Sequence, residues 1–306
     1  MESSASFFGK FLKTVRRPVF WVLPAAAAVF AWLFFFVFPA PDNFPPNTLY
    51  KVAEGSSLEK ISADLYDLHL IRSRSAFEFF VTLSGGDRRI KDGYYLFDRK
   101  TPVYNISLRL AMGDRHLVPE KITIPEGTNL KQIAEIFSAK LPNFDKTKFL
   151  AEASDKEGYL FPDTYFFFSP DTEEDVLRAM EENFSKRISS LLPAIKSSGH
   201  SEGDIIIMAS LLEKEAKGKE DRPIISGILW KRLSMGMPLQ ADVAPGTYKR
   251  KGLPSEPIGN PGLGSIKDAI YPESSPYLYY LHDKEGIAHF AATFSEHEAN
   301  IRKYLK

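Results

Sequence analysis

Two carboxylates in an apolar stretch are the residues of this chain best placed for acid–base chemistry. Glu213 and Glu215 stand in the run IIIMASLLEKEAK, residues 205–217. At about 100° per residue, Glu215 continues the apolar stripe of a predicted helix, whereas Glu213 points to the other side. A carboxyl group in line with such a stripe is either a helix-end charge that reaches solvent or a partly desolvated acid. Desolvation raises a carboxyl pKa, so the second arrangement would make Glu215 a proton donor near neutral pH.

A second group of polar residues stands in a stretch rich in glycine and proline, residues 235–264, which we expect to form long loops. Within it, a single residue separates Gln240 from Asp242. On an extended segment, side chains two positions apart face the same side, so both could contact one polar ligand. Asp242 is also a favoured turn residue, and the alternative is that it only stabilises a turn.

The elements that would position these residues follow from apolar spacing and from capping and turn residues. The sequence predicts helices over residues 171–192, 204–217 and 223–233, strands over residues 277–282 and 289–294 joined as a hairpin, and a final helix from residue 295. Together with the repeat described next, this mixture predicts the α+β fold class.

A faint internal repeat precedes these elements. Residues 51–65 read KVAEGSSLEKISADL and residues 123–137 read TIPEGTNLKQIAEIF. Each copy has a short apolar run, a Glu-Gly pair, a capping Ser or Thr and then apolar residues at helical spacing. We therefore expect the same strand, turn and helix twice, although this is also a common unit of ordinary α+β structure. Residues 104–110 are expected to begin a further helix.

The N-terminal segment predicts a membrane anchor. Residues 18–38 are apolar and would span about 31 Å as a helix, which matches the hydrocarbon core of a bilayer. A cleaved signal peptide is the alternative, but its apolar region is usually only about 7–15 residues long. Basic residues precede the segment, so we expect residues 1–17 in the cytoplasm and residues 42–306 outside. The proline-rich residues 39–47 read as a semi-rigid linker.

Composition excludes several classes of function. The 306 residues include 39 basic and 39 acidic side chains, and a zero net charge disfavours a nucleic-acid partner. The chain has no cysteine, which excludes thiol catalysis and cysteine metal sites. The remaining metal candidates, which follow no common ligand spacing, are His282, His289 and His297. We therefore predict no metal site.

Several motifs, taken in order, give this chain a specific resemblance. They are EGYLFPDTY at residues 157–165, MASLLEKEA at 208–216, MPLQAD at 237–242, GLP at 252–254, PI at 257–258, NPG at 260–262, SPYLY at 275–279 and the His289-Phe290 pair. The set resembles the endolytic murein transglycosylases, the MltG/YceG-like family. The likeness extends from the predicted anchor to the C-terminus.

The resemblance implies an activity and a set of site residues. It implies a lytic transglycosylase that cuts peptidoglycan glycan strands without a cofactor, leaves 1,6-anhydromuramic ends and limits strand length. Its catalytic acid would be Glu215, which the helical spacing also favours. The implied substrate-binding residues are Gln240, Asp242, Tyr248, Asn260 and His289.

The resemblance also implies an organisation and partners. Residues 48–120 would form a small LysM-like module and residues 121–306 the catalytic domain, outside the inner membrane, with cell-wall synthases as candidate partners. One departure affects the site, because the loop after Asp242 is shortened and Gly246 stands where the family has an asparagine. This puts substrate contacts along that loop in doubt.

Two other functions remain open at this point. A muramidase would use water, with Asp242 or Glu256 as the second carboxylate that hydrolysis needs. A catalytically silent scaffold would bind glycan through the repeat module and recruit synthases. The released muropeptide end distinguishes all three, because an anhydro end is lighter by one water and a scaffold releases nothing.

Overall fold

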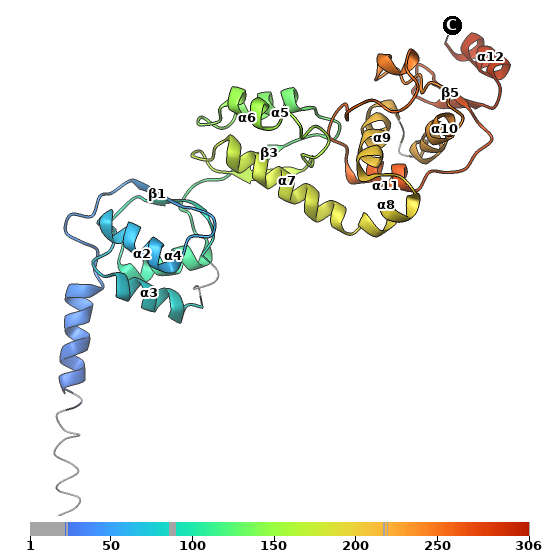
Figure 1. The fold of residues 1–306 in the computed structure, drawn as a ribbon. Helices are drawn as coiled ribbons and strands as arrows, with labels where there is room; N and C mark the ends of the chain where they lie inside the picture. Colours follow the sequence, from blue (N-terminus) through green and yellow to red (C-terminus); the bar gives the residue numbers. More distant parts are fainter. Residues whose placement is uncertain (1–21, 23, 86–89, 217, 219, 306) are drawn as a thin grey trace, which may run out of the picture. The chain divides into compact units, whose positions relative to one another are not determined.

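The computed structural model describes residues 22, 24–85, 90–216, 218 and 220–305, and the chain divides into two compact units, Met1–Val118 and Pro119–Lys306 (Figure 1). Each unit buries its own apolar side chains. The α+β class predicted from the sequence is confirmed, because helices alternate with three small two-stranded sheets in the described residues.

The segment predicted to span a membrane lies partly outside the described residues, which omit 18–21 and 23. Residues 24–32 are helical and continue into a π-helical turn, η1 (Leu33–Val37). Within the part of the chain that the structure describes, we find no helix that is both long enough and apolar enough to cross a membrane. The anchor therefore stays a prediction.

The first unit is built on a strand–helix–helix–strand order. Its elements are β1 (Thr48–Val52), α2 (Leu58–Asp67), α3 (Arg74–Leu83), β2 (Gly93–Phe97) and α4 (Val103–Met112). The two strands pair antiparallel, with Thr48 opposite Phe97 and Val52 opposite Gly93. The Ser57 hydroxyl caps α2 by accepting the Lys60 backbone N–H. The helix α4 confirms the one expected to begin near residue 104.

The second unit opens with the same order. Its elements are β3 (Glu120–Thr123), α5 (Leu130–Ser138), α6 (Lys146–Glu152) and β4 (Thr164–Phe167), and the two strands again pair antiparallel. In both copies the apolar positions of the first helix are buried, as Ile61 and Leu65 show in α2 and Ile133 and Phe137 in α5. The repeat predicted from the sequence is thus a repeat of βααβ structure.

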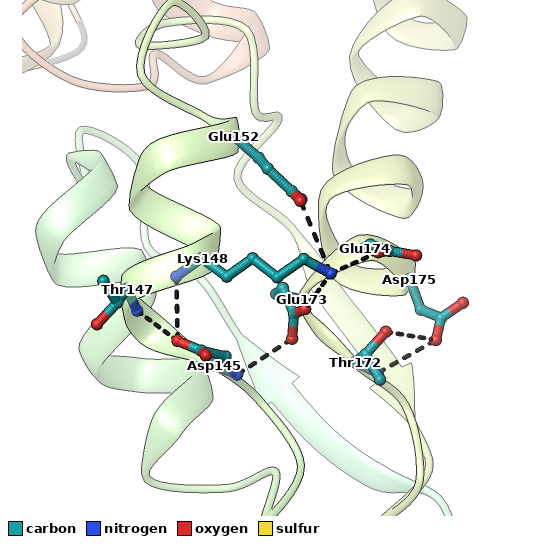
Figure 2. A network of polar contacts seen from close by, with 8 residues as sticks. All are labelled: Asp145, Thr147, Lys148, Glu152, Thr172, Glu173, Glu174 and Asp175. Carbon is teal, nitrogen blue, oxygen red and sulfur yellow. Dashed lines mark hydrogen bonds and ion pairs between the residues drawn. The ribbon is translucent and has the colours of Figure 1, made fainter.

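A lysine ties the second repeat to the following helix, α7 (Glu173–Ser189). Figure 2 shows Lys148 Nζ reaching Glu173 at 2.9 Å, Glu174 at 2.5 Å and Glu152 at 3.7 Å. Glu173 also accepts the Asp145 backbone N–H at 3.1 Å, which joins the start of α6 to the start of α7. The ion pairs of Lys148 and the hydrogen bond from the Asp145 N–H to Glu173 therefore fix α6 against α7.

The rest of the second unit contains the helix of the two glutamates. After α8 (Leu192–Ser198) come α9 (Glu202–Glu215), α10 (Arg222–Ser234), a 3₁₀ turn η2 (Pro245–Tyr248), α11 (Leu263–Ile270), β5 (Tyr279–His282), β6 (Ala288–Ala291) and α12 (Phe294–Tyr304). These bounds agree closely with the predicted helices and hairpin. In Figure 1, α9 lies among α10 and α11, and it packs against both.

The burial of α9 differs from the predicted single apolar stripe. Met208, Leu211 and Leu212 are fully buried, but so are Ile206 and Ala209 on the other side. Neighbouring helices and loops therefore cover both of these faces of α9, as a helix with apolar residues on both faces requires.

Candidate active site

The helix α9 delivers Glu215 to the edge of the core. The helix begins at a capping box in which the Ser201 hydroxyl accepts the Asp204 N–H and the Asp204 carboxylate accepts from Ser201. It ends at Glu215, because Ala216 already has extended backbone angles. Its buried body fixes the last residue in place, so the Glu215 side chain starts from a rigid element.

The Glu215 carboxyl group is desolvated. Its Oε2 atom is buried and has no hydrogen-bond partner among the described residues. The Tyr280 hydroxyl, also buried, interacts electrostatically with this carboxyl group. A buried polar atom without a partner costs folding free energy, and active sites are where such costs are retained.

Burial raises the pKa of Glu215 above its ordinary value, and the negative charge of Asp242 raises it further. The Tyr280 hydroxyl, the Val243 backbone N–H and Arg232 partly offset these effects. The end of a helix adds an unfavourable field for an anion, which acts in the same direction as burial. Glu215 is therefore arranged to hold a proton, which is the second of the two arrangements that the sequence left open.

Glu215 opens into a hollow of about 590 Å³. The predicted site residues that line it with Glu215 are Gln240, Asp242 and Tyr248. Lys214, Arg232, the strand residues Tyr279 to His282, and Phe294, His297 and Ile301 of α12 complete most of the wall. The hollow is thus polar around the acid and more apolar along α12.

Gln240 and Asp242 reach the hollow by a different route from the predicted extended segment. Gln240 has a backbone φ of +51°, which non-glycine residues rarely adopt. Asp242 lies in a turn and accepts a hydrogen bond from the Tyr248 hydroxyl. Both side chains still line the hollow, so the turn and the ligand-facing position that the sequence left as alternatives coexist at Asp242. The Asp242 hydrogen bond and burial raise the pKa of Tyr248 to about 12.

Glu213, the other acid of the pair, points away from the hollow. Its Oε2 accepts the Gly262 N–H at 2.9 Å, and its Oε1 lies 3.8 Å from the Arg222 guanidinium. These contacts hold α9 to the loop before α11 and to α10. Glu213 is therefore a structural acid, in agreement with its predicted orientation.

The structure does not bring Asn260 to the hollow. Its side chain is fully buried, where it accepts the Gly158 and Leu160 N–H groups at 3.0 and 2.9 Å and donates to the Thr128 carbonyl and Glu157. All of its polar capacity is used inside the protein, so it has none left for substrate. The structure thus places Asn260 in the core, and the expected substrate contact stays a prediction that no contact here supports.

His289 is also absent from the lining of the hollow. Its Nε2 contacts Asp283 at 2.8 Å, and its ring stacks on Tyr304 with centroids 3.5 Å apart. These contacts join the β5–β6 hairpin to α12. His289 therefore supports a wall of the site, and its expected substrate contact stays a prediction.

Sequence reasoning missed the residues behind the acid. Tyr280 lies on β5, and the Arg232 guanidinium donates to the Leu278 and Leu239 carbonyls at 2.7 and 2.5 Å. His297 of α12 also lines the hollow, and its buried Nδ1 has no hydrogen-bond partner within the described part of the chain. Burial and Arg232 lower the pKa of His297. The SPYLY motif pointed to this strand but could not say which tyrosine faces the glutamate.

The chemistry available here is proton transfer by one buried acid. No group of three or more His, Cys, Asp or Glu residues able to hold a metal occurs among the residues that the structure describes. Polar side chains beside the acid can orient a hydroxyl-rich ligand, because they combine donors with acceptors.

Comparison with known proteins gives consistent matches. The model of the YceG-like family matches residues 50–244 and 246–303, and the break falls in the loop after Asp242. An endolytic murein transglycosylase of Bacillus subtilis is 29% identical, over 87% of both chains.

Two further relatives are more distant. An endolytic murein transglycosylase of Streptococcus pneumoniae is 25% identical over 94% of this chain, which spans only 64% of that relative's length. A crystal structure of a YceG-like protein from Listeria monocytogenes is 28% identical with a TM-score of 0.54, covering 83% of this chain and 98% of that one.

Proposed function

The chain belongs to the YceG-like family, and on that premise we propose that it is a lytic transglycosylase that cuts the glycan strands of peptidoglycan. The observation that carries the proposal is the desolvated Glu215 carboxyl group at the wall of a hollow large enough for sugar units. Its raised pKa provides the protonated acid that glycosidic cleavage needs.

Glu215 acts first as an acid and then as a base. Its proton passes to the oxygen that joins C1 of N-acetylmuramic acid to the next N-acetylglucosamine, and the C1–oxygen bond breaks. The 2-acetamido group of the same sugar relieves the positive charge at C1. The Glu215 carboxylate then takes the proton of the C6 hydroxyl, whose oxygen bonds to C1 and closes a 1,6-anhydro ring. No water is consumed and Glu215 ends protonated.

One carboxylate is enough for this sequence of steps. The C6 hydroxyl belongs to the sugar being cut, so its effective concentration is very high and no second acid need activate it. Between the two steps, the Tyr280 hydroxyl and Arg232 stabilise the Glu215 anion, which is the form they favour. Gln240, Asp242 and Tyr248 are placed to hold the sugar.

Hydrolysis is the competing activity, and one observation favours it. Asp242 lines the same hollow as Glu215 and could activate water there, whereas Glu256 is exposed and does not line it. The test is to digest purified glycan strands with the full-length chain in detergent and weigh the new ends. Anhydro ends from internal cuts support the lyase. Reducing ends alone would show that the chain is a hydrolase and not a lyase. An absence of cleavage would favour the catalytically silent scaffold.

The proposal extends to an anchor at residues 18–38, with the catalytic unit outside the cytoplasmic membrane. Support comes from the long uncharged segment and from the basic residues before it. A protease added to intact spheroplasts should remove the C-terminal unit and leave the N-terminus protected. Recovery of the whole chain in the soluble fraction would reject the anchor.

We further propose that the first unit binds glycan as a LysM-like module and so helps to set the strand length. Support comes from its βααβ order and from its own closed core. Removing residues 48–118 should weaken the binding of long strands more than of short fragments, because remote contacts position substrate without breaking bonds. An equal change in the binding of long strands and short fragments would indicate that the first unit is only a spacer. Cell-wall synthases stay candidate partners, to be tested by crosslinking in cells.

A further inference from the structure

A run of three cations stands beside the active hollow. Lys249, Arg250 and Lys251 directly follow Tyr248, whose ring lines the hollow of Glu215. All three side chains are exposed. None of the three side chains forms an ion pair or a hydrogen bond with any residue that the structure describes. Their charge is therefore available to a ligand.

The loop that carries the cations is held in place by the protein. The Thr247 hydroxyl is buried, where it accepts the Ala241 N–H at 3.0 Å and donates to the Ala244 carbonyl at 2.7 Å. Farther along, Lys251 pairs with Pro238 in a β-bridge. The cations are thus presented by an ordered backbone, which lowers the entropy cost of binding.

Arg250 and Lys251 also line a second hollow of about 510 Å³. Its wall is otherwise largely apolar, with Val243, Ala244, Pro245, Leu253, Pro254 and Ile258. Val243 lines both this hollow and that of Glu215. A ligand held at the acid can therefore extend a branch past Val243 onto an apolar floor with a cationic rim.

The substrate in the proposed function carries such a branch. The lactyl group of N-acetylmuramic acid bears a short peptide, whose small apolar side chains and free carboxylates match an apolar floor and a cationic rim. We propose that Lys249, Arg250 and Lys251 bind the carboxylates of this peptide stem, so that the enzyme selects strands bearing peptides over bare glycan. The inference rests on the proposed function and adds a determinant of specificity to it.

The test compares two substrates with the full-length chain in detergent. One is uncrosslinked strands that carry peptides, and the other is the same strands after an amidase has removed them. In a variant with Lys249→Gln, Arg250→Gln and Lys251→Gln, KM for peptide-bearing strands should rise about tenfold, as expected for three exposed charge pairs. The KM for bare strands should change much less, and added salt should narrow the difference.

Two matched variants serve as controls. Lys249→Arg, Arg250→Lys and Lys251→Arg together retain the charge and should restore KM. Lys140→Gln, Lys186→Gln and Lys196→Gln remove three exposed cations from other surfaces and should leave KM unchanged.

The outcomes separate this inference from the activity itself. If the unaltered chain cuts neither substrate, the proposed function fails. The peptide-binding role is wrong if the unaltered chain cuts both substrates with equal kcat/KM. It is also wrong if the triple glutamine variant raises KM equally for peptide-bearing and bare strands. A triple variant that keeps its selectivity but no longer binds anionic lipid vesicles would assign the cations to a membrane surface instead.

Discussion

The two βααβ repeats have the same local design but different surroundings. In the first, the Glu-Gly turn after β1 is exposed, and Gly55 has no neighbouring atom within 4 Å of its missing side chain. In the second, Gly127 donates to the Asn260 carbonyl at 2.8 Å, and Asn260 donates back to Thr128. Its missing side chain would lie 3.3 Å from Glu213 on α9.

This difference shows that the same βααβ repeat can have two different structural roles. The first repeat closes its own core with α4, and its turn is exposed to solvent. The core of the second repeat includes residues of α7. Its turn forms hydrogen bonds with Asn260, in a loop next to the helix that carries Glu215. The second copy is thus a support of the active site, and the following experiments test how far the two copies differ.

The largest effect should come from the acid itself. Glu215→Gln should lower kcat by a factor of about 10²–10⁴, because the amide can neither donate nor regain the proton. Glu213→Gln should retain most of the activity, since that side chain binds Gly262 and faces away from the hollow. Both are measured by mass spectrometry of released ends. An equal loss of kcat in the two variants would contradict the assignment of Glu215 as the acid and of Glu213 as a structural residue.

Asn260→Ala should destabilise the second unit alone. The change removes four side-chain hydrogen bonds in a buried place, and we expect the free energy of unfolding to fall by about 3–5 kcal/mol. Hydrogen exchange resolved by peptide should show faster exchange over β3, α5 and the loop near residue 158. Faster exchange over β1 and α2 as well would indicate that the units are not independent.

A matched pair of glycines compares the two turns directly. Gly55→Ala and Gly127→Ala both place a side chain at positive φ, +70° and +77°, and each should cost about 1 kcal/mol for that reason. Gly127→Ala should cost about 1 kcal/mol more, because the new carbon presses on Glu213. Thermal unfolding and cleavage rates provide the measurements. If both substitutions lower the free energy of unfolding equally, the contact of the new side chain with Glu213 causes no strain.

Acid should loosen the second repeat through Glu173. Burial alone would raise its pKa, but Lys148 and backbone N–H groups outweigh burial and lower it. A lowered folded-state pKa stabilises the protein above the unfolded value of about 4.3, and this contribution is lost as pH falls through the folded value. Glu173→Gln should cost about 1–2 kcal/mol at neutral pH and little in acid. A constant cost across pH would assign the effect to packing.

The smallest expected effects are shifts of the pH profile. Cleavage needs protonated Glu215, so activity falls as pH rises through its raised pKa. Asp242→Asn removes a charge that raises this pKa and should move the alkaline limb to lower pH. Tyr280→Phe removes a group that lowers it and should move the limb to higher pH. Shifts of the same sign would contradict this electrostatic arrangement, and complete inactivity of Asp242→Asn would favour a hydrolase.

Much of the fold could be read from short-range signals. Apolar spacing and capping residues act over a few positions, so α7, α9, α10 and the β5–β6 hairpin could be predicted from neighbouring residues alone. The repeat was recognisable for the same reason. Glu215 could be preferred over Glu213 because two residues on a helix differ in direction whatever surrounds it.

Other features depended on residues that meet only after folding. The spacing of α9 predicted one buried stripe, but elements that precede and follow it in the sequence bury apolar residues on both of its faces. Asn260 stands in a motif typical of a site, yet packing places it inside, where it joins segments from three parts of the chain. A local sequence pattern cannot predict these long-range contacts, because they depend on which elements pack together.

The sequence by itself determined the helices, the hairpin, the repeated unit and the different directions of Glu213 and Glu215, because each is decided by neighbours along the chain. Only the tertiary structure decided that Tyr280 and Arg232 accompany Glu215 and that Gln240 reaches the hollow with a left-handed backbone conformation. It also decided that the turn of one repeat is exposed while that of the other is bonded to Asn260. The physical reason is that desolvation and charge at a site come from distant residues brought within a few ångströms.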